Sequence, residues 1–173
     1  MKSKKIYLAG PMEEVDDGGA RWRSNIKSFL MIFDYTFFDP TVAEAKYTPA
    51  KYRNNWMGYM TAFKQWKVDD LPRFKRLMQK IIENDITSLR DSEYCLVYYD
   101  RETHKECYLK GGAGTIGEIN ECYMLKWAGK KAPKCILMST IPIAEMPGWI
   151  IGCSDEIFFD WDKVKEYFIK RSD

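Results

Sequence analysis

The stretch Tyr94–Tyr99 reads YCLVYY and is apolar along its whole length. A strand that is covered on both faces, as in a parallel sheet between two layers of helices, has this continuous pattern. The preceding residues, Phe74–Leu89, place apolar side chains at three- and four-residue steps and predict an amphipathic helix. After the strand come a polar loop, Asp100–Lys110, and a glycine-rich run, GGAGTIGE, that leads into another helix. This order predicts a βαβ unit.

The same alternation continues toward both ends of the chain. Further strands are expected at Lys5–Ala9, Tyr35–Phe38, Lys134–Met138 and Glu156–Phe159, and further helices from about Ala20 to Phe33, up to about Gly129, and at Asp162–Arg171. Residues 41–70 are expected to form an irregular loop followed by one or two helices, and Pro142–Trp149 a loop. About five strands that alternate with helices predict a single doubly wound α/β domain over residues 1–173.

The composition narrows the class of protein. Of the 173 residues, 46% are hydrophobic, so a disordered chain is not expected, and the net charge of +2 does not predict a binder of nucleic acid polymers. No apolar run approaches the roughly 18–20 residues of a membrane span. The first apolar stretch is too short for a signal peptide, so no membrane association and a cytoplasmic location are expected.

The cysteines and the single histidine predict neither a disulfide framework nor a metal site. The number of cysteines is odd, and no two of them have CxxC spacing. We therefore expect them to be small buried hydrophobic residues. They are Cys95, Cys107, Cys122, Cys135 and Cys153. His104 lies in a charged loop and is expected to be solvated. We therefore expect no metal and no catalytic system based on histidine.

Ligands of doubly wound sheets bind beyond the carboxyl ends of the strands. Three expected loops lie there: Gly10–Gly19, Asp39–Tyr47 and Asp100–Gly117. The run KGGAGTIGE, residues 110–118, is neither a GxGxxG fingerprint nor a P-loop, but it ends with Glu118 at the expected start of a helix. A carboxylate there is stabilised in its ionised form, so Glu118 is either a nucleophile or a residue that only complements the helix dipole.

For one loop and two further residues, the sequence pattern alone allows either a functional or a structural interpretation. The loop GPMEEVDDGGARWR could hold sugar hydroxyls or a base edge, or form an acidic surface loop. Tyr7, near the end of the first strand, could reach Glu118 or be a core aromatic residue. Asp85, within an otherwise apolar face of its helix, is either exposed or functional, because burying a carboxylate without partners is costly.

Several short motifs occur in one order: YLAGPM, DDGGARWR, FFDPT, the pair Asn84-Asp85 and GAGTIGEI. Together they resemble the nucleoside 2-deoxyribosyltransferase family, over roughly Lys5 to Asp155, with residues 47–74 poorly covered. The resemblance implies a flavodoxin-like fold and a double displacement in which a glutamate attacks the anomeric carbon and a second base resolves the intermediate. No organic cofactor or metal is needed for this chemistry.

The resemblance also implies roles for individual residues. Glu118 matches the nucleophile, Tyr7 the residue that orients it, and Asp85 the acid that handles the proton of the base. The residues expected to bind the substrate are Gly10, Pro11, Asp17, Phe38, Asp39, Lys110, Gly112 and Gly114. The expected ligand is a small nucleoside, nucleotide or nucleobase.

One position departs from the family. Members that act on free nucleosides usually have an acid six residues before the nucleophile, where this chain has Gly112. Members that act on 5′-monophosphates have small residues there, and Lys110 would attract a phosphate. An N-glycosidase of monophosphates is therefore an alternative, unless Asp100 or Glu106 supplies the acid.

Two further classes remain open, a nucleotide sensor without turnover and an electron-transfer protein. A homo-oligomer is expected from the resemblance, in which Glu145–Trp149 matches a loop that closes the pocket of a neighbouring subunit. The aromatic residues of 47–66 would suit such an interface.

Overall fold

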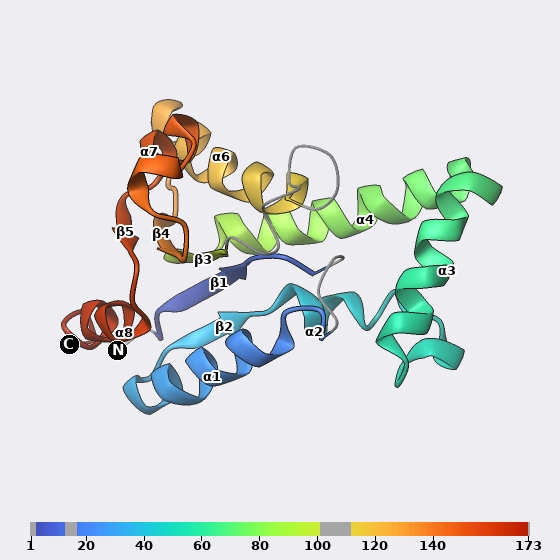
Figure 1. The fold of residues 1–173 in the computed structure, drawn as a ribbon, viewed down its shortest axis with the longest axis horizontal. Coiled ribbons are helices and arrows are strands. Elements are labelled where there is room, and N and C mark those ends of the chain that lie inside the picture. The colour runs from blue at the N-terminus through green and yellow to red at the C-terminus, as the bar shows by residue number, and fades with distance from the viewer. Residues whose placement is uncertain (1–2, 13–16, 101–111, 173) are drawn as a thin grey trace.

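The computed structural model describes residues 3–12, 17–100 and 112–172. Its centre is a five-stranded, all-parallel sheet with the strand order β2-β1-β3-β4-β5 (Figure 1). The strands are β1 Lys5–Ala9, β2 Thr36–Phe38, β3 Tyr94–Tyr99, β4 Lys134–Ser139 and β5 Glu156–Phe158. This is the flavodoxin-like order, so the predicted doubly wound fold is confirmed.

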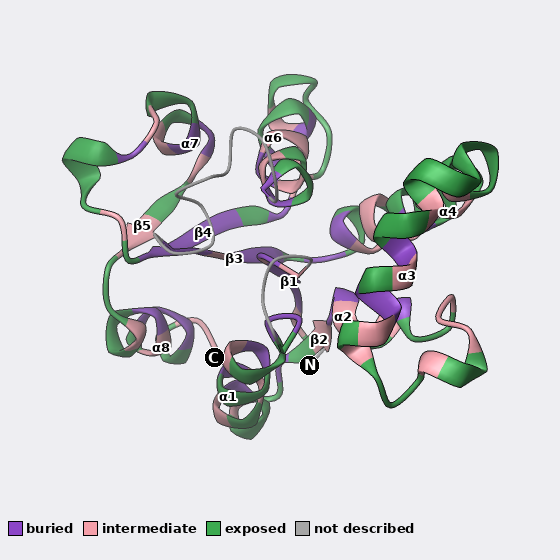
Figure 2. Ribbon diagram, turned by 45° about the vertical axis from the view of Figure 1, so that its right-hand side comes forward, coloured by how far each residue is buried: buried purple, intermediate pink, exposed green. Residues whose placement is uncertain are grey.

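Helices cover both faces of the sheet, as Figure 2 shows. Helices α1 (Ala20–Leu30) and α8 (Trp161–Ile169) pack on one face. Helices α6 (Ala113–Trp127), α7 (Gly148–Cys153) and the last turns of α4 (Leu71–Arg90) pack on the other. The sheet is therefore the middle of three layers, and its central strands β1, β3 and β4 are largely buried.

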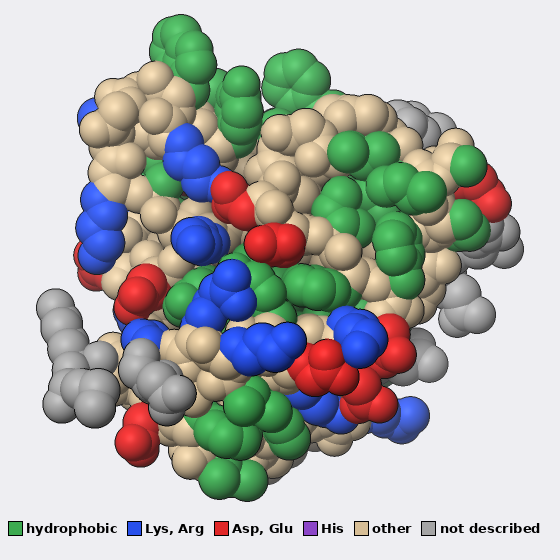
Figure 3. Space-filling view, turned by 90° about the vertical axis from the view of Figure 1, so that its left-hand side faces the viewer, with side chains coloured by type: hydrophobic (Ala, Val, Ile, Leu, Met, Phe, Trp, Pro, Cys, Tyr) green, Lys and Arg blue, Asp and Glu red, His purple; other side chains and the backbone are tan. Residues whose placement is uncertain are grey.

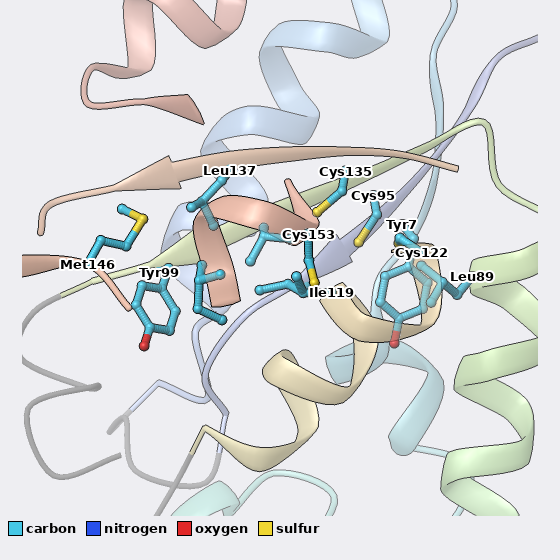
Figure 4. Close-up of a cluster of buried hydrophobic side chains, with 13 residues drawn as sticks. Tyr7, Leu89, Cys95, Tyr99, Ile119, Cys122, Cys135, Leu137, Met146 and Cys153 are labelled. Atoms are coloured by element: carbon cyan, nitrogen blue, oxygen red, sulfur yellow. The ribbon is translucent and has the colours of Figure 1, made fainter. Parts of the chain in front are cut away.

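Alternate residues of the central strands enter different cores. Tyr7 of β1 and Cys95 of β3, which are paired in register, both point to the face of α6, whereas Leu8 and Leu96 point to the face of α1. In Figure 4 the side chains of Cys95, Cys122, Cys135 and Cys153 lie together in the first of these cores. All four are buried free thiols, as the sequence predicted, and Cys107 lies outside the described residues.

A third core belongs to a helical cap, which we define as residues 40–82. It contains α2 (Pro40–Glu44), a 3₁₀-helix (Ala50–Tyr52), α3 (Trp56–Asp69) and the first half of α4. Tyr59, Met60, Phe63 and Ile81 are its buried centre, and further aromatic residues surround them. The aromatic residues that fit no strand pattern thus form a core of their own, beside the carboxyl ends of β1 and β2.

Three local predictions were wrong. The expected loop after β2 begins with α2, because the Asp39 side chain caps the helix and Pro40 occupies its first turn. Helix α6 starts at Ala113, so most of the glycine-rich run is helical. Helix α7 begins inside the expected loop Pro142–Trp149, which also contains a 3₁₀-helix at Ile143–Glu145. Another 3₁₀-helix, Met31–Phe33, extends α1.

The surface carries charges of both signs. On the side of the molecule that carries the chain ends, Lys and Arg side chains lie among Asp and Glu (Figure 3). In the described part of the chain, no helix combines the length and the apolar character needed to cross a membrane.

Candidate active site

A cavity of about 130 Å³ lies beyond the carboxyl ends of β1 and β2, between the sheet and the helical cap. Five of the residues predicted from the sequence line it: Gly10, Pro11, Asp85, Gly114 and Glu118. The other lining residues are Met12, Pro40, Glu44, Trp56, Phe63, Met78, Ile81 and Thr115. The loop after β1, the cap and α6 thus bring together residues that are more than 100 positions apart in the sequence.

Glu118 lines this cavity, and Tyr7 contacts it from the buried strand behind. The Tyr7 hydroxyl donates a hydrogen bond of 2.5 Å to Oε1 of Glu118. Tyr7 is fully buried in β1, and its ring stacks on Phe38 of β2 at 5.2 Å between centroids. Burial, and then the negative charges of Glu118 and Asp85, raise the pKa of Tyr7 far above its ordinary value. Tyr7 therefore stays a neutral donor that fixes one oxygen of the carboxylate.

The protonation of Glu118 differs from the prediction. Burial raises the pKa of Glu118 to about 8, and the negative charge of Asp85 adds to this, whereas the Tyr7 hydrogen bond and the charge of Arg23 lower it. The expected stabilisation of the ionised form by a helix start is wrong, because Glu118 is the sixth residue of α6 and lies beyond its first turn. A carboxyl group with this pKa changes its charge near physiological pH.

Asp85 is the second carboxyl group of the cavity and comes from α4. Burial raises the pKa of Asp85 to about 6, against the opposing effects of the Asn84 hydrogen bond and the charge of Lys46. Lys46 itself donates a hydrogen bond of 2.6 Å to Oδ1 of Asn84. Burial thus brings the pKa values of both carboxyl groups into the range in which they can exchange protons near neutral pH.

Arg23 holds the loop that follows β1, and the sequence analysis missed it. Its side chain is fully buried and lies 3.7 Å from the Asp39 carboxylate. At distances of 2.9 to 3.5 Å its guanidinium donates to the backbone carbonyl oxygens of Leu8, Gly10, Pro11, Gly18 and Gly19. The motif DDGGARWR contains this arginine four residues after Gly19, but its exposed neighbour Arg21 belongs to the same motif, so the pattern alone does not single out Arg23.

The paired glycines allow this loop to pass between Arg23 and the cap. Gly18 and Gly19 have positive φ values of 62° and 74°, which glycine adopts without strain. A Cβ atom at Gly19 would lie 2.3 Å from Nη1 of Arg23, and one at Gly18 would lie 2.8 Å from the Trp56 ring. The loop after β1 is therefore packed against both the arginine and the wall of the cavity.

Three of the predicted binding residues take structural positions. The exposed carboxylate of Asp17 accepts hydrogen bonds from the backbone N–H groups of Gly19 and Arg21, at 2.8 and 3.0 Å. Asp39 caps α2 and accepts from Lys27 at 2.5 Å. Phe38 supports the Tyr7 ring. These three are not among the residues that line the cavity, and their role in substrate binding stays a prediction.

The pKa of Asp39 follows from the same contacts. Burial alone would raise it, but the hydrogen bonds from Lys27 and Thr41 and the positive charge of Arg23 lower it below its ordinary value. Asp39 is therefore an ionised anchor that links α1 to the start of the cap.

The remaining predicted residues lie at or beyond the edge of the described chain. Gly112 is the buried residue that precedes α6, and its carbonyl accepts from Ile116 at 2.9 Å. Lys110, Glu106 and His104 lie outside the described residues. Within the described ranges, no group of three His, Cys, Asp or Glu side chains is arranged to hold a metal ion.

Replacing Tyr7 by phenylalanine tests the pair directly. Loss of the hydrogen bond that lowers the pKa of Glu118 is expected to move this pKa above about 8. Turnover is expected to fall about 10- to 100-fold near pH 7, since a hydrogen bond to a charged group contributes roughly 1.5–3 kcal/mol. The rate of base release against pH measures both effects. An unchanged profile in Tyr7→Phe would contradict the orienting role, and Tyr123→Phe, on the exposed side of α6, is the control.

Comparisons with known proteins agree with this architecture. The sequence matches no protein family model and no curated protein. Among solved structures it is similar to a 2-deoxyribosyltransferase from Bacillus psychrosaccharolyticus, with 18% identity, a TM-score of 0.57, and coverage of 94% of this chain and 91% of that one. It is also similar to a 2-deoxyribosyltransferase from Leishmania mexicana, with 16% identity, a TM-score of 0.55, and coverage of 96% and 97%. At identities this low, structural similarity shows the fold alone. The chain has the flavodoxin-like fold of these 2-deoxyribosyltransferases.

Proposed function

We propose that the chain belongs to the nucleoside 2-deoxyribosyltransferase family and transfers a deoxyribosyl group between nucleobases. The observation that carries the proposal is that Glu118, which accepts a hydrogen bond from Tyr7, lines one cavity together with Asp85. The motifs that resemble the family contribute these three side chains, and the fold agrees with that of solved 2-deoxyribosyltransferases.

In the first half of the reaction, the ionised Glu118 attacks the anomeric carbon. Because Tyr7 holds Oε1, the free oxygen Oε2 is the attacking atom. The bond between this carbon and the base nitrogen breaks, its electron pair moves to the base, and protonated Asp85 donates a proton to the base. The product is a glycosyl ester on Glu118, as in a retaining glycosidase.

In the second half, a different base resolves the ester. Its nitrogen attacks the anomeric carbon while Asp85 accepts the proton of that base, and the Glu118 carboxylate leaves. Water in place of the base would give hydrolysis, so exclusion of water by the cap decides between transfer and hydrolysis.

The charge of the cavity favours a nucleoside over a 5′-monophosphate. Glu44, Asp85 and Glu118 line it, and the described lining residues include no Lys or Arg. A phosphate dianion would find no cationic side chain among these residues and would meet the negative charge of the ionised Glu118 that the reaction requires, whereas a neutral nucleoside would not meet like charge. The monophosphate N-glycosidase remains the alternative that the assay must separate, because Lys110 lies outside the described residues.

The decisive assay follows products by chromatography. The protein is incubated with 2′-deoxynucleosides and with their 5′-monophosphates, each with and without a second free base. A new nucleoside that forms only with the added base supports the transferase. Free base from the monophosphates alone would favour the N-glycosidase. Binding without release from any substrate would favour the sensor.

The pH dependence of kcat/KM is expected to be bell-shaped, with limbs near pH 6 and near pH 8. Activity requires Glu118 ionised and Asp85 protonated, although their pKa values are about 8 and about 6. Below pH 6 the rate falls because Glu118 is protonated, and above pH 8 it falls because Asp85 has lost its proton. Asp85→Asn is expected to lower the rate about 10²-fold and to remove the alkaline limb.

The same substitution has a second expected effect. Without Asp85 the acidic limb reports the ionisation of Glu118 alone, and removal of the Asp85 charge lowers this pKa below about 8. An alkaline limb that persists in Asp85→Asn would contradict the assignment of the acid. Asp91→Asn, at the exposed end of α4, is the control and should leave the profile unchanged.

The homo-oligomer, the cytoplasmic location and the extent of the single domain stay predictions.

A further inference from the structure

Helix α6 contributes three neighbouring residues to the wall of the cavity, Gly114, Thr115 and Glu118. Thr115 precedes Glu118 by about one helical turn, so the two side chains leave the same face of α6. The bond from Cα to Cβ in a helix tilts toward the N-terminus, so the Glu118 side chain extends toward the turn that carries Thr115. The Glu118 carboxyl group and the Thr115 side chain therefore belong to the same part of the cavity.

The hydroxyl group of Thr115 is open to this cavity. In the described chain, the fully enclosed side-chain atoms without a hydrogen-bond partner are Trp22 Nε1, Trp56 Nε1 and the Tyr167 hydroxyl. Thr115 Oγ1 also has no hydrogen-bond partner among the described residues, yet it is not one of these enclosed atoms. It therefore keeps accessible surface. Because Thr115 lines the cavity and is only 4% exposed, this surface faces the cavity.

The space and the chemistry beside Thr115 suit a sugar hydroxyl. A Cβ atom at Gly114 would meet no heavy atom of the described chain within 4 Å, so the wall next to Thr115 leaves room for a ligand. Among the described lining residues, only Thr115 carries a neutral hydroxyl group. A hydroxyl both donates and accepts hydrogen bonds, so it can pair with another hydroxyl in either direction.

The stereochemistry of the reaction decides which sugar hydroxyl lies there. In a β-nucleoside, the base and the 5′-carbon lie on one face of the sugar ring, and the 3′-hydroxyl lies on the other. Glu118 displaces the base from the opposite side, as the nucleophile of a retaining glycosidase does. It therefore approaches the ring face that carries the 3′-hydroxyl, and a 2′-deoxyribosyl group has no other hydroxyl on that face.

We propose that Thr115 determines sugar specificity by forming a hydrogen bond with the 3′-hydroxyl of the deoxyribosyl group. This assignment rests on the proposed transferase function, because the attack by Glu118 on the anomeric carbon sets the orientation of the sugar. The hydrogen bond fixes the ring at a second point beside the nucleophile, which favours the aligned geometry that the displacement needs.

The test compares 2′-deoxynucleosides with 2′,3′-dideoxynucleosides, which differ only in the 3′-hydroxyl. Both forms of adenosine, inosine, cytidine and thymidine are assayed for base release, and the ratio of kcat/KM is taken for the base that is released fastest. Thr115→Val replaces the hydroxyl by a methyl group. It is expected to lower this ratio about 3- to 10-fold, as loss of one neutral hydrogen bond predicts, with activity on the dideoxynucleoside kept within about twofold.

Two variants accompany this measurement. Thr115→Ser retains a hydroxyl group and should keep the ratio within about twofold of that of the unmodified protein. Thr61→Val, exposed on α3, is the matched control for the exchange of threonine by valine and should leave the ratio unchanged.

The ratio of two substrates in one preparation does not depend on the folded fraction, so partial unfolding of Thr115→Val cannot imitate the result. An equal loss on both substrates, or a ratio in Thr115→Ser as low as in Thr115→Val, would overturn the role of Thr115 and leave the transferase in place. No base release from any of the substrates by the unmodified protein would instead overturn the proposed function and this assignment with it.

Discussion

Glu118→Gln is expected to lower kcat/KM for base release by at least about 10⁴-fold, because the variant has no nucleophilic oxygen to form the glycosyl ester. The amide carbonyl can still accept the Tyr7 hydrogen bond, so the shape of the site is kept. Kinetics with deoxynucleosides measure the loss. Glu121→Gln on the same helix, whose carboxylate pairs with Arg90 at the surface, is the control and should retain near-normal activity.

The same variant separates an enzyme from a sensor. If the chain is an enzyme, Glu118→Gln binds deoxynucleosides but releases no base, and no covalent adduct appears by mass spectrometry. Residual base release at more than about one hundredth of the normal rate would exclude Glu118 as the nucleophile.

Thermal stability gives an independent check on Glu118→Gln. The pKa of Glu118 rises from 4.5 to about 8 on folding, so the folded state binds the proton more tightly than the unfolded state. Its stability therefore falls as pH rises from 4.5 through 8 and is level above that. The glutamine variant lacks this loss, so its Tm should exceed that of the unmodified protein above pH 8 and match it near pH 4.

Arg23→Met is expected to lower the free energy of unfolding by about 3 kcal/mol or more, because it removes the donors of several buried carbonyl groups at once. Asp39 also loses a cation at 3.7 Å. For a chain of this length the Tm should fall by roughly 2–4 °C for each kcal/mol lost. Activity should fall as well, since the carbonyl groups of Gly10 and Pro11 belong to the loop that lines the cavity.

Two further variants control for the position of the arginine on the helix and for its charge. Arg21→Met, exposed on the same helix, should change stability by less than about 0.5 kcal/mol. Arg23→Lys keeps the charge but gathers its donors at one point, so it should recover little of the lost stability. A Tm of Arg23→Met equal to that of Arg21→Met would show that the loop does not depend on the guanidinium.

The sheet could be predicted from sequence because its signal is local. YCLVYY is apolar at consecutive positions, and both faces of β3 are buried. The cap could not be predicted in this way, because its aromatic residues pack against one another and not against the strands. Helix α2 was missed since the Asp39-Pro40 pair was taken as the end of a strand only, although it is also a helix start.

Site residues that belong to a sequence motif could be predicted, whereas residues placed in the site by tertiary packing could not. The resemblance marked Glu118, Tyr7 and Asp85, and the structure brings these three together. The pKa of Glu118 depends on burial, which spacing along the chain does not show. Arg23 and Glu44 were missed because charged residues are buried only when the fold supplies partners, and those partners are distant in sequence or are backbone atoms.

Helix α4 is one continuous helix that packs in two of the cores. Its first half packs in the aromatic core of the cap and its last turns in the core of the sheet, and between Arg73 and Arg90 it contains neither glycine nor proline. Helices bend sharply almost only at such residues, at bulges or where water enters, so this one resists hinging. The part of the cavity wall that α4 contributes should therefore move together with the sheet as one body.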